Sequence, residues 1–151
     1  WIEKPPQDHI INYGTKIVLH DLTLPDGSTV QYWRKIRMLA TAYSAATSGK
    51  SKDHPQYGRT RLGLQAGKGV VAIDPRVINL GSNVYVPGYG VALAGDTGGG
   101  IKGKRIDLGY PEEAMEGWYR WTDVYLLAPV PPKTQLNVVL PDYPVERKST
   151  R

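Results

Sequence analysis

The sequence predicts an all-β protein, and three observations carry that prediction. Short apolar runs rich in β-branched residues alternate with turn residues, which is typical of small barrels rather than parallel layered sheets. Glycine and proline are frequent, with 17 Gly and 12 Pro in 151 residues. Only one segment carries helix signals. We therefore expect a small closed barrel, and a domain of this size buries ~68–70% of its unfolded surface without metal or disulfide staples.

The first part of the chain predicts a hairpin that extends from the barrel. Two β-rich runs, residues 15–20 and 28–33, are joined by Leu24-Pro25-Asp26-Gly27, which are residue types of a tight turn. We expect residues 1–35 to form a linker and this hairpin. Residues 36–128 should form the barrel, and residues 129–151 a proline-rich C-terminal extension.

The barrel strands are expected at six short runs and the helix at one segment. The helix prediction rests on Pro111 at the first helical position, on Glu112 and Glu113 in the first turn, where they complement the helix dipole, and on Gly117 as a stop. The strand runs are residues 36–44, 70–73, 83–86, 90–94, 105–108 and 121–127.

Composition excludes several classes of function. The absence of cysteine excludes Cys-His hydrolases, thiolate zinc sites and disulfide scaffolds. The three histidines, at positions 9, 20 and 54, lack the spacing of metal ligands, so we expect no metal and no cofactor. No apolar run approaches the ~20 residues that cross a bilayer. The net charge of +5 favours anionic partners, as does a basic stretch at residues 47–68, but without zinc-finger spacing or an aromatic RNA-binding signature we do not expect nucleic acid.

The densest segment for chemistry is a glycine-rich turn with a carboxylate at each end. Five glycines fall within residues 95–103, and Asp96 and Asp107 bracket them. If the runs at 91–94 and 105–108 are neighbouring strands, the two carboxylates come within reach of each other, and two like charges raise the pKa of one of them. A protonated aspartate can then act as a general acid. Equally, both can be carboxylates that cap backbone amides of the turn.

A third aspartate, Asp74, precedes these two in the sequence. The three aspartates and the glycines between them form one pattern. The pattern comprises Ala72-Ile73-Asp74-Pro75, Leu80-Gly81-Ser82, Val84-Tyr85-Val86, Asp96-Thr97-Gly98-Gly99, Ile101-Lys102-Gly103 and Arg105-Ile106-Asp107. It resembles the three-aspartate (3D) domain family, which includes stationary-phase survival muralytic proteins and is similar to the catalytic barrel of membrane-bound lytic transglycosylase A. The resemblance begins near Thr41-Ala42-Tyr43 and ends near Val124-Tyr125.

The resemblance implies a fold and a reaction. The fold is a six-stranded double-psi β-barrel, and the reaction is non-hydrolytic cleavage of peptidoglycan between MurNAc and GlcNAc that leaves a 1,6-anhydroMurNAc end. Asp107 would be the acid/base residue, supported by Asp96 and Asp74. Departures from the family pattern at Asn79, Gly100 and the Trp118-Tyr119 pair leave all three aspartates in place.

Further residues are candidates for contact with the glycan. Lys102 is a cation that can bind a muramoyl carboxylate, and Thr97 and Gly98 belong to the same turn. Aromatic rings can stack on sugar faces. The candidate rings for such stacking are Tyr43, Tyr89, Tyr110 and Trp118.

Two other functions stay open from the residues. A barrel with glycine turns and aromatic rings also suits a non-catalytic module that binds cell-wall glycan. The Asp96-Thr97-Gly98 turn resembles that of dimeric aspartic proteases, although Asp74 and Asp107 would then have no role. We expect an extracellular or cell-wall protein, secreted or anchored through an N-terminal part missing here, since the chain does not begin with Met and residues 8–16 resemble the closing strand of a glycine-rich adhesion-type domain.

Overall fold

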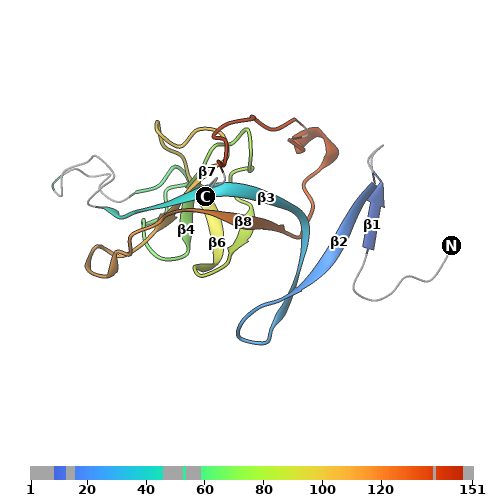
Figure 1. The fold of residues 1–151 in the computed structure, drawn as a ribbon, viewed down its shortest axis with the longest axis horizontal. Helices are drawn as coiled ribbons and strands as arrows, with labels where there is room; N and C mark the ends of the chain where they lie inside the picture. Colours follow the sequence, from blue (N-terminus) through green and yellow to red (C-terminus); the bar gives the residue numbers. More distant parts are fainter. Residues whose placement is uncertain (1–8, 13–15, 46–52, 54–58, 138, 148–151) are drawn as a thin grey trace.

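The protein is mainly β, as predicted. The computed structural model describes residues 9–12, 16–45, 53, 59–137 and 139–147, so most of the basic stretch before residue 59 and the residues of the expected linker before His9 lie outside the described part. Eight strands are present (Figure 1): β1 His9–Asn12, β2 Lys16–Thr23, β3 Thr29–Tyr43, β4 Val70–Ile73, β5 Asn83–Val86, β6 Gly90–Asp96, β7 Arg105–Gly109 and β8 Tyr119–Leu127.

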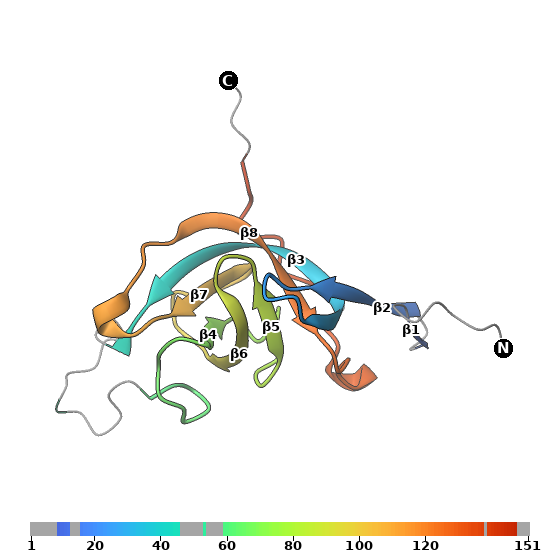
Figure 2. The same ribbon diagram turned by 90° about the horizontal axis from the view of Figure 1, so that it is seen from below.

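Six of these strands form a closed ring of pairings. Their order is β3-β7-β4-β6-β5-β8, and an antiparallel pairing of β8 with β3 closes the ring. The β3–β7 and β4–β6 pairs are parallel, and the other pairs are antiparallel. In Figure 2 these strands curve around a common interior. The strand count matches the predicted small barrel, and its double-psi topology stays a prediction.

Side chains alternate between the interior of the ring and its outer face. Successive residues of a strand point to opposite faces, so every second residue enters the core. On β3, Met38 and Ala40 are fully buried in the main core, whereas Thr41 stays partly exposed. On β7, Ile106 and Leu108 enter the same core, which leaves Asp107 on the outer face. Aliphatic side chains from all six strands fill this interior.

The predicted hairpin is confirmed. Strands β2 and β3 pair antiparallel, with Thr23 opposite Thr29 across the turn. Gly27 has φ of 89°, which a side chain would strain, and Asp26 Oδ1 accepts from Ser28 N at 2.9 Å and Ser28 Oγ at 2.6 Å. β3 is one strand of 15 residues that runs from the hairpin into the ring without ending at residue 35 (Figure 1). The division of the chain into domains stays a prediction.

The predicted helix is only a single 3-10 turn, Glu112–Ala114. Pro111 is extended, with ψ of 148°, so it precedes the turn instead of occupying its first position. The turn contains no buried residue, and a short segment without an apolar face does not repay the entropy of helix nucleation. A second 3-10 turn spans Lys133–Gln135. No helix in the described part of the chain is long and apolar enough to cross a membrane.

Candidate functional site

Asp96 and Asp107 come together by flanking one residue, Ala72. The expectation that their strands are neighbours is wrong, because β4 lies between β6 and β7. Ala72 on β4 is opposite Asp107 on one side and opposite Asp96 on the other. Two strand spacings separate the two backbones by roughly 10 Å. Both aspartates are partly buried on the outer face of the ring.

A bulge at Gly95 brings Asp96 to that face. The register between β4 and β6 shifts after the Val71–Ala94 pair, so Ala72 is opposite Asp96 and not Gly95. Ala94 is therefore in the core while Asp96 is on the outside, although residues two apart on a regular strand share a face. A Cβ at Gly95 would lie 3.1 Å from Val70 Cγ1. The bulge thus accounts for one of the five clustered glycines.

Asp107 is a partly desolvated carboxyl with one hydroxyl partner. Thr41 is directly opposite it on β3, and Thr41 Oγ1 donates to Asp107 Oδ1 at 2.8 Å. Burial raises the pKa of Asp107, and the charge of Asp96 adds to that rise. The Thr41 hydrogen bond and the positive charge of Arg105 oppose it without cancelling it. The protonated form of Asp107 is therefore favoured beyond that of an ordinary aspartate.

Asp96 is held by amides and a phenol. Its Oδ1 accepts from the backbone N–H of Arg61 at 2.8 Å and from that of Thr97 at 2.9 Å, and its Oδ2 accepts from the Tyr43 hydroxyl at 3.2 Å. Burial, followed by the negative charges of Asp96 and Asp107, raises the pKa of Tyr43. Tyr43 therefore stays a hydrogen-bond donor at physiological pH. The backbone of Tyr43 is also held, because its carbonyl oxygen accepts from Tyr110 N at 2.8 Å.

A small apolar cluster includes Ala72, the residue that lies between the two aspartates in the sheet. Tyr43, Ala72 and Ile101 are buried together, and Ala66 packs against them. Ile101 belongs to the glycine loop, which we define as residues 97–104, and its N–H donates to Gly98 O at 3.0 Å. A Cβ at Gly98 would lie 3.2 Å from Ile101 Cγ1, so this glycine permits the close turn. The loop thereby contributes one buried side chain, Ile101, to this cluster.

Arg105 adds a cation to the same face. It stands two residues before Asp107 on β7, and its Nη1 donates to Gly100 O at 3.2 Å. Among the residues that the structure describes, its buried Nε has no hydrogen-bond partner. A guanidinium suits planar, bidentate recognition of a carboxylate. Arg105 and Thr41 were not singled out from sequence, although the alternation of β7 and β3 places both beside Asp107.

Asp74 belongs to a different environment. It is 3% exposed and accepts hydrogen bonds from four groups. These are the backbone N–H, Nε and Nη2 of Arg76, and the backbone N–H of Gly103 at 2.8 Å. These bonds and the charge of Arg76 outweigh its burial and lower the pKa of Asp74 to about 2. No hydrogen bond recorded for Asp74 involves Asp96 or Asp107. Asp74 is thus an ionised anchor for Arg76 and the end of the glycine loop.

The other aromatic candidates lie in a second cluster. Tyr89 donates its hydroxyl to Gly109 O at 2.6 Å and accepts from Gly69 N at 2.7 Å, and burial raises its pKa to about 12. Its ring meets that of Tyr110 edge to face, and Trp118 Nε1 donates to the Tyr110 hydroxyl at 2.8 Å. Arg120 lies 3.7 Å from the Trp118 ring centroid. These rings are largely buried and pack within the barrel, and Tyr89 also lines an open pocket. Their contact with glycan stays a prediction.

The remaining candidates belong to the glycine loop or its edge. Lys102 is exposed, and Thr97 is partly buried beside Asp96. Within the described residues, no group of three or more His, Asp or Glu side chains could hold a metal ion.

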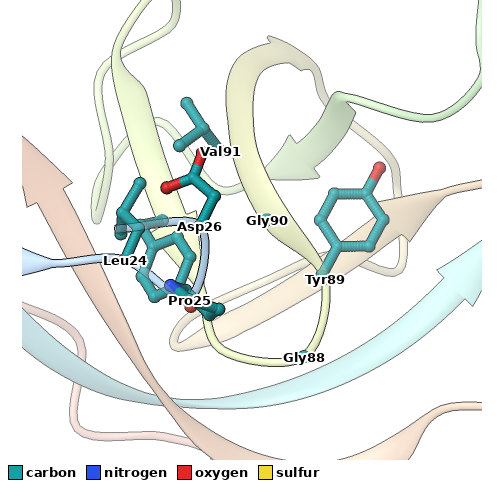
Figure 3. Close-up of a pocket in the computed structure, with 8 residues that line it drawn as sticks. Leu24, Pro25, Asp26, Gly88, Tyr89, Gly90 and Val91 are labelled. Atoms are coloured by element: carbon teal, nitrogen blue, oxygen red, sulfur yellow. The ribbon is translucent and has the colours of Figure 1, made fainter. Parts of the chain in front are cut away.

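An open pocket lies away from the aspartates. It has a volume of about 530 Å³ and lies between the hairpin turn and the turn joining β5 to β6. Figure 3 shows Leu24, Pro25 and Asp26 on the hairpin side and Gly88 and Tyr89 on the other. Its lining includes neither Asp96 nor Asp107. The paired carboxylates therefore form the candidate active site by their chemistry, and this pocket is separate from it.

Comparison with known proteins gives the class of this fold and site. The family model of the 3D domain matches residues 69–128. The matched segment contains Asp74, Asp96 and Asp107, so the resemblance to the 3D domain family predicted from these three aspartates is confirmed. The matched segment contains β4 to β8, whereas β3, which supplies Thr41 and Tyr43, precedes it.

Three proteins of Bacillus subtilis (strain 168) are similar to the chain. YabE, named for a candidate role in shaping the cell wall, is 45% identical over 86 residues, which are 54% of this chain and 19% of YabE. The cell wall-binding protein YocH is 45% identical over 85 residues, 54% of this chain and 28% of YocH. The SPbeta prophage-derived protein YorM is 41% identical over 76 residues, 47% of this chain and 32% of YorM. The matches thus span a third or less of each relative.

Proposed function

We propose that the protein is a lytic transglycosylase that cleaves the peptidoglycan bond between MurNAc and GlcNAc, with Asp107 as the acid/base residue. The observation that carries this proposal is the partly buried carboxyl of Asp107, which accepts from Thr41 and lies across Ala72 from Asp96. Burial raises the pKa of Asp107, and a general acid must hold a proton to donate. The names of YabE and YocH point to the bacterial cell wall and support this substrate. An extracellular or wall-associated location belongs to the same proposal.

The reaction needs one principal acid. An ordinary glycosidase uses two carboxyl groups, and the second one supplies a nucleophile or activates water. In a lytic transglycosylase the C6 hydroxyl of the MurNAc residue is the nucleophile, and an intramolecular attack gains effective concentration. Protonated Asp107 donates to the glycosidic oxygen as the bond to C1 breaks. Its carboxylate then takes the C6 hydroxyl proton as O6 bonds to C1.

Asp96 and Tyr43 support this cycle without being consumed in it. The charge of Asp96 raises the pKa of Asp107 and so favours its protonated form. Asp96 Oδ1 already accepts from two backbone amides, which leaves it less suited to proton transfer. Tyr43 fixes Asp96 Oδ2. Asp74 contributes through the loop that it anchors and not through the reacting atoms.

The cations beside Asp107 fit an acidic glycan. MurNAc carries a free lactyl carboxylate where the stem peptide is absent and peptide carboxylates where it is attached, and Arg105 has a buried Nε without a partner in the described part of the chain. We assign Arg105 to a substrate carboxylate, with exposed Lys102 as a weaker second contact. Arg105→Gln should then raise KM for glycan that carries lactyl and peptide carboxylates by about tenfold, the loss of one charge-assisted pair. Equal KM in variant and wild type would remove Arg105 from binding.

The test of the reaction is the end group of its products. Purified peptidoglycan is incubated with wild type and with Asp107→Asn, and soluble fragments are analysed by mass spectrometry. Wild type should release fragments with 1,6-anhydroMurNAc ends, and Asp107→Asn should release none while giving the same circular dichroism spectrum. Reducing ends from wild type would show hydrolysis and contradict the proposal.

A non-catalytic module that binds cell-wall glycan is the second candidate function. The name of YocH favours it. Binding of wild type to insoluble peptidoglycan without any soluble product would select this module. The dimeric aspartic protease is disfavoured because Asp96 Oδ1 already accepts hydrogen bonds from two backbone amides. Pepstatin-sensitive proteolysis would be needed to support it.

A further inference from the structure

The C-terminal segment crosses the outer face of the barrel beside the candidate site. Residues 141–147 follow the end of the 3D-domain match at residue 128. Glu146 accepts from Arg37 Nε at 2.9 Å and from Arg37 Nη2 at 3.0 Å. Arg37 lies on β3 and shares its outer face with Thr41. The segment is therefore fixed to the strand that supplies the hydroxyl partner of Asp107.

Tyr143 of this segment contacts the end of the glycine loop. Lys104 N donates to Tyr143 O at 2.8 Å, and Leu39 N on β3 donates to Lys104 O at 3.0 Å. Lys104 is thus held from both sides at the point where β7 begins. From there the pairs Leu39–Arg105 and Thr41–Asp107 continue the register. The β3–β7 pairing that places Asp107 opposite Thr41 therefore begins next to Lys104, which Tyr143 holds through its backbone carbonyl.

The same segment also contacts Arg76, the ion-pair partner of Asp74. Arg76 Nη2 donates to the Tyr143 hydroxyl at 2.5 Å, and Arg76 also pairs with Asp74. Asp74 in turn accepts from Gly103 N at 2.8 Å. Gly103 has φ of 70°, and a Cβ there would overlap the carbonyl oxygen of Tyr143. Gly103 is thus fitted closely between Asp74 and Tyr143.

We propose that residues 141–147 are a strap that holds the glycine loop and the start of β7 in the geometry that Asp107 requires, with Tyr143 as the positioning residue. The strap contacts Gly103 and Lys104, and Lys104 directly precedes β7, the strand that carries Asp107. Asp74 and Arg76 belong to the same device. Tyr143 touches neither Asp107 nor Asp96 in any recorded hydrogen bond, so its action is indirect.

The test compares Tyr143→Ala with Val145→Ala in the full chain. Val145 is 68% exposed in the same segment and serves as the matched control. Amide hydrogen exchange is measured at Ile101, Gly103 and Lys104, and the carboxyl titration of Asp107 is followed by NMR. Tyr143→Ala keeps the backbone carbonyl that accepts from Lys104 but removes the ring beside Gly103 and the hydroxyl that accepts from Arg76. It should speed exchange at Gly103 and Lys104 by about fivefold, the effect of one lost hydrogen bond on local opening, and leave Ile106 unchanged. The pKa of Asp107 should fall toward its ordinary value.

Two results would overturn the strap. Exchange and titration equal to those of Val145→Ala would show that Tyr143 holds nothing. Faster exchange at Ile106 by the same factor would show that the segment only stabilises the whole barrel. If Tyr143→Ala does not fold, Tyr143→Phe removes the hydroxyl contact with Arg76 alone, and the same pattern at smaller size, at Gly103 first, is expected.

The strap can be judged separately from the proposed reaction, although its link to catalysis rests on that proposal. Exchange and titration need no substrate. Should Asp107→Asn release the same products as wild type, the reaction assignment fails while a change in loop exchange still supports the strap. Should the reaction hold, Tyr143→Ala should lower kcat more than it raises KM.

Discussion

Two carboxyl groups of this barrel adjoin the same glycine loop but differ in the charge state that they favour: Asp74 accepts from Gly103 within the loop, and Asp107 follows the loop on β7. Around Asp74, an arginine and backbone amides compensate burial and keep the carboxylate ionised. Around Asp107, burial acts with a nearby negative charge, and one hydroxyl bond is too little to compensate. The comparison teaches that burial alone does not decide protonation. The hydrogen-bond donors and the charges that surround the buried carboxyl decide its protonation state.

The largest expected difference between the two regions is in turnover. Asp107→Asn should lower the rate of anhydro-product release by about 10²- to 10⁴-fold, the contribution typical of a general acid/base group. Asp74→Asn should retain most turnover at a temperature where it is folded, because Asp74 only anchors the loop. Initial rates on one peptidoglycan preparation measure both. Equal losses would erase the distinction.

Stability should rank the two variants in the opposite order. Asp74→Asn replaces an ionised acceptor of several hydrogen bonds and should lower the free energy of unfolding by about 2 kcal/mol. Asp107→Asn removes a carboxyl whose charge is disfavoured by burial, so it should leave stability unchanged or raise it. Urea unfolding at pH 7 measures both values. A less stable Asp107→Asn would mean that the ionised carboxylate is well solvated.

The pH dependence of stability should separate the regions next. The folded pKa of Asp74, about 2, is below its unfolded value of 3.8, so its stabilisation is present above about pH 4 and is lost as the pH falls toward 2. The folded pKa of Asp107 is raised, so its contribution becomes more favourable as the pH falls through that value. Wild type should therefore lose stability as the pH falls from about 4 to 2, and Asp74→Asn should lack this part of the loss. Thermal unfolding across this range tests it.

The smallest effect sharpens the comparison at one hydroxyl. Thr41→Val removes the hydroxyl that donates to Asp107 Oδ1 and keeps a similar side-chain shape. The pKa of Asp107 should rise further, and the alkaline limb of activity should move to higher pH by about half a pH unit, the effect of one weak hydrogen bond. The pH profile of product release measures this. An unchanged profile with normal folding would show that Thr41 does not bond the acting carboxylate.

Much of this fold follows from local patterns. The strands at residues 70–73 and 83–86 were predicted with their observed bounds, because short β-branched runs between glycines leave little choice. The hairpin followed from its turn residues. The order of strands in the ring did not, since β6 and β7 are close in sequence yet separated by β4, and nothing local encodes which edge a strand meets.

The site was predictable in its residues but not in its contacts. Asp96, Asp107 and Tyr43 were expected, whereas the bulge that turns Asp96 outward depends on the register of β4 against β6. Asp74 was expected to support the site, and the structure records its bonds to Arg76 and Gly103 instead of to the other aspartates. Arg76 and Tyr143 are 67 positions apart, so their contact could not be inferred from spacing.

The long strand β3 has a mechanical consequence. Its 15 residues span roughly 50 Å of nearly continuous backbone, with one shift of register between Tyr32 and Arg34. The hairpin turn and Thr41 therefore lie near opposite ends of the single strand β3, which Figure 1 shows. A load applied at the hairpin tip would reach the Thr41 end through the covalent backbone of one strand, with no loop between them.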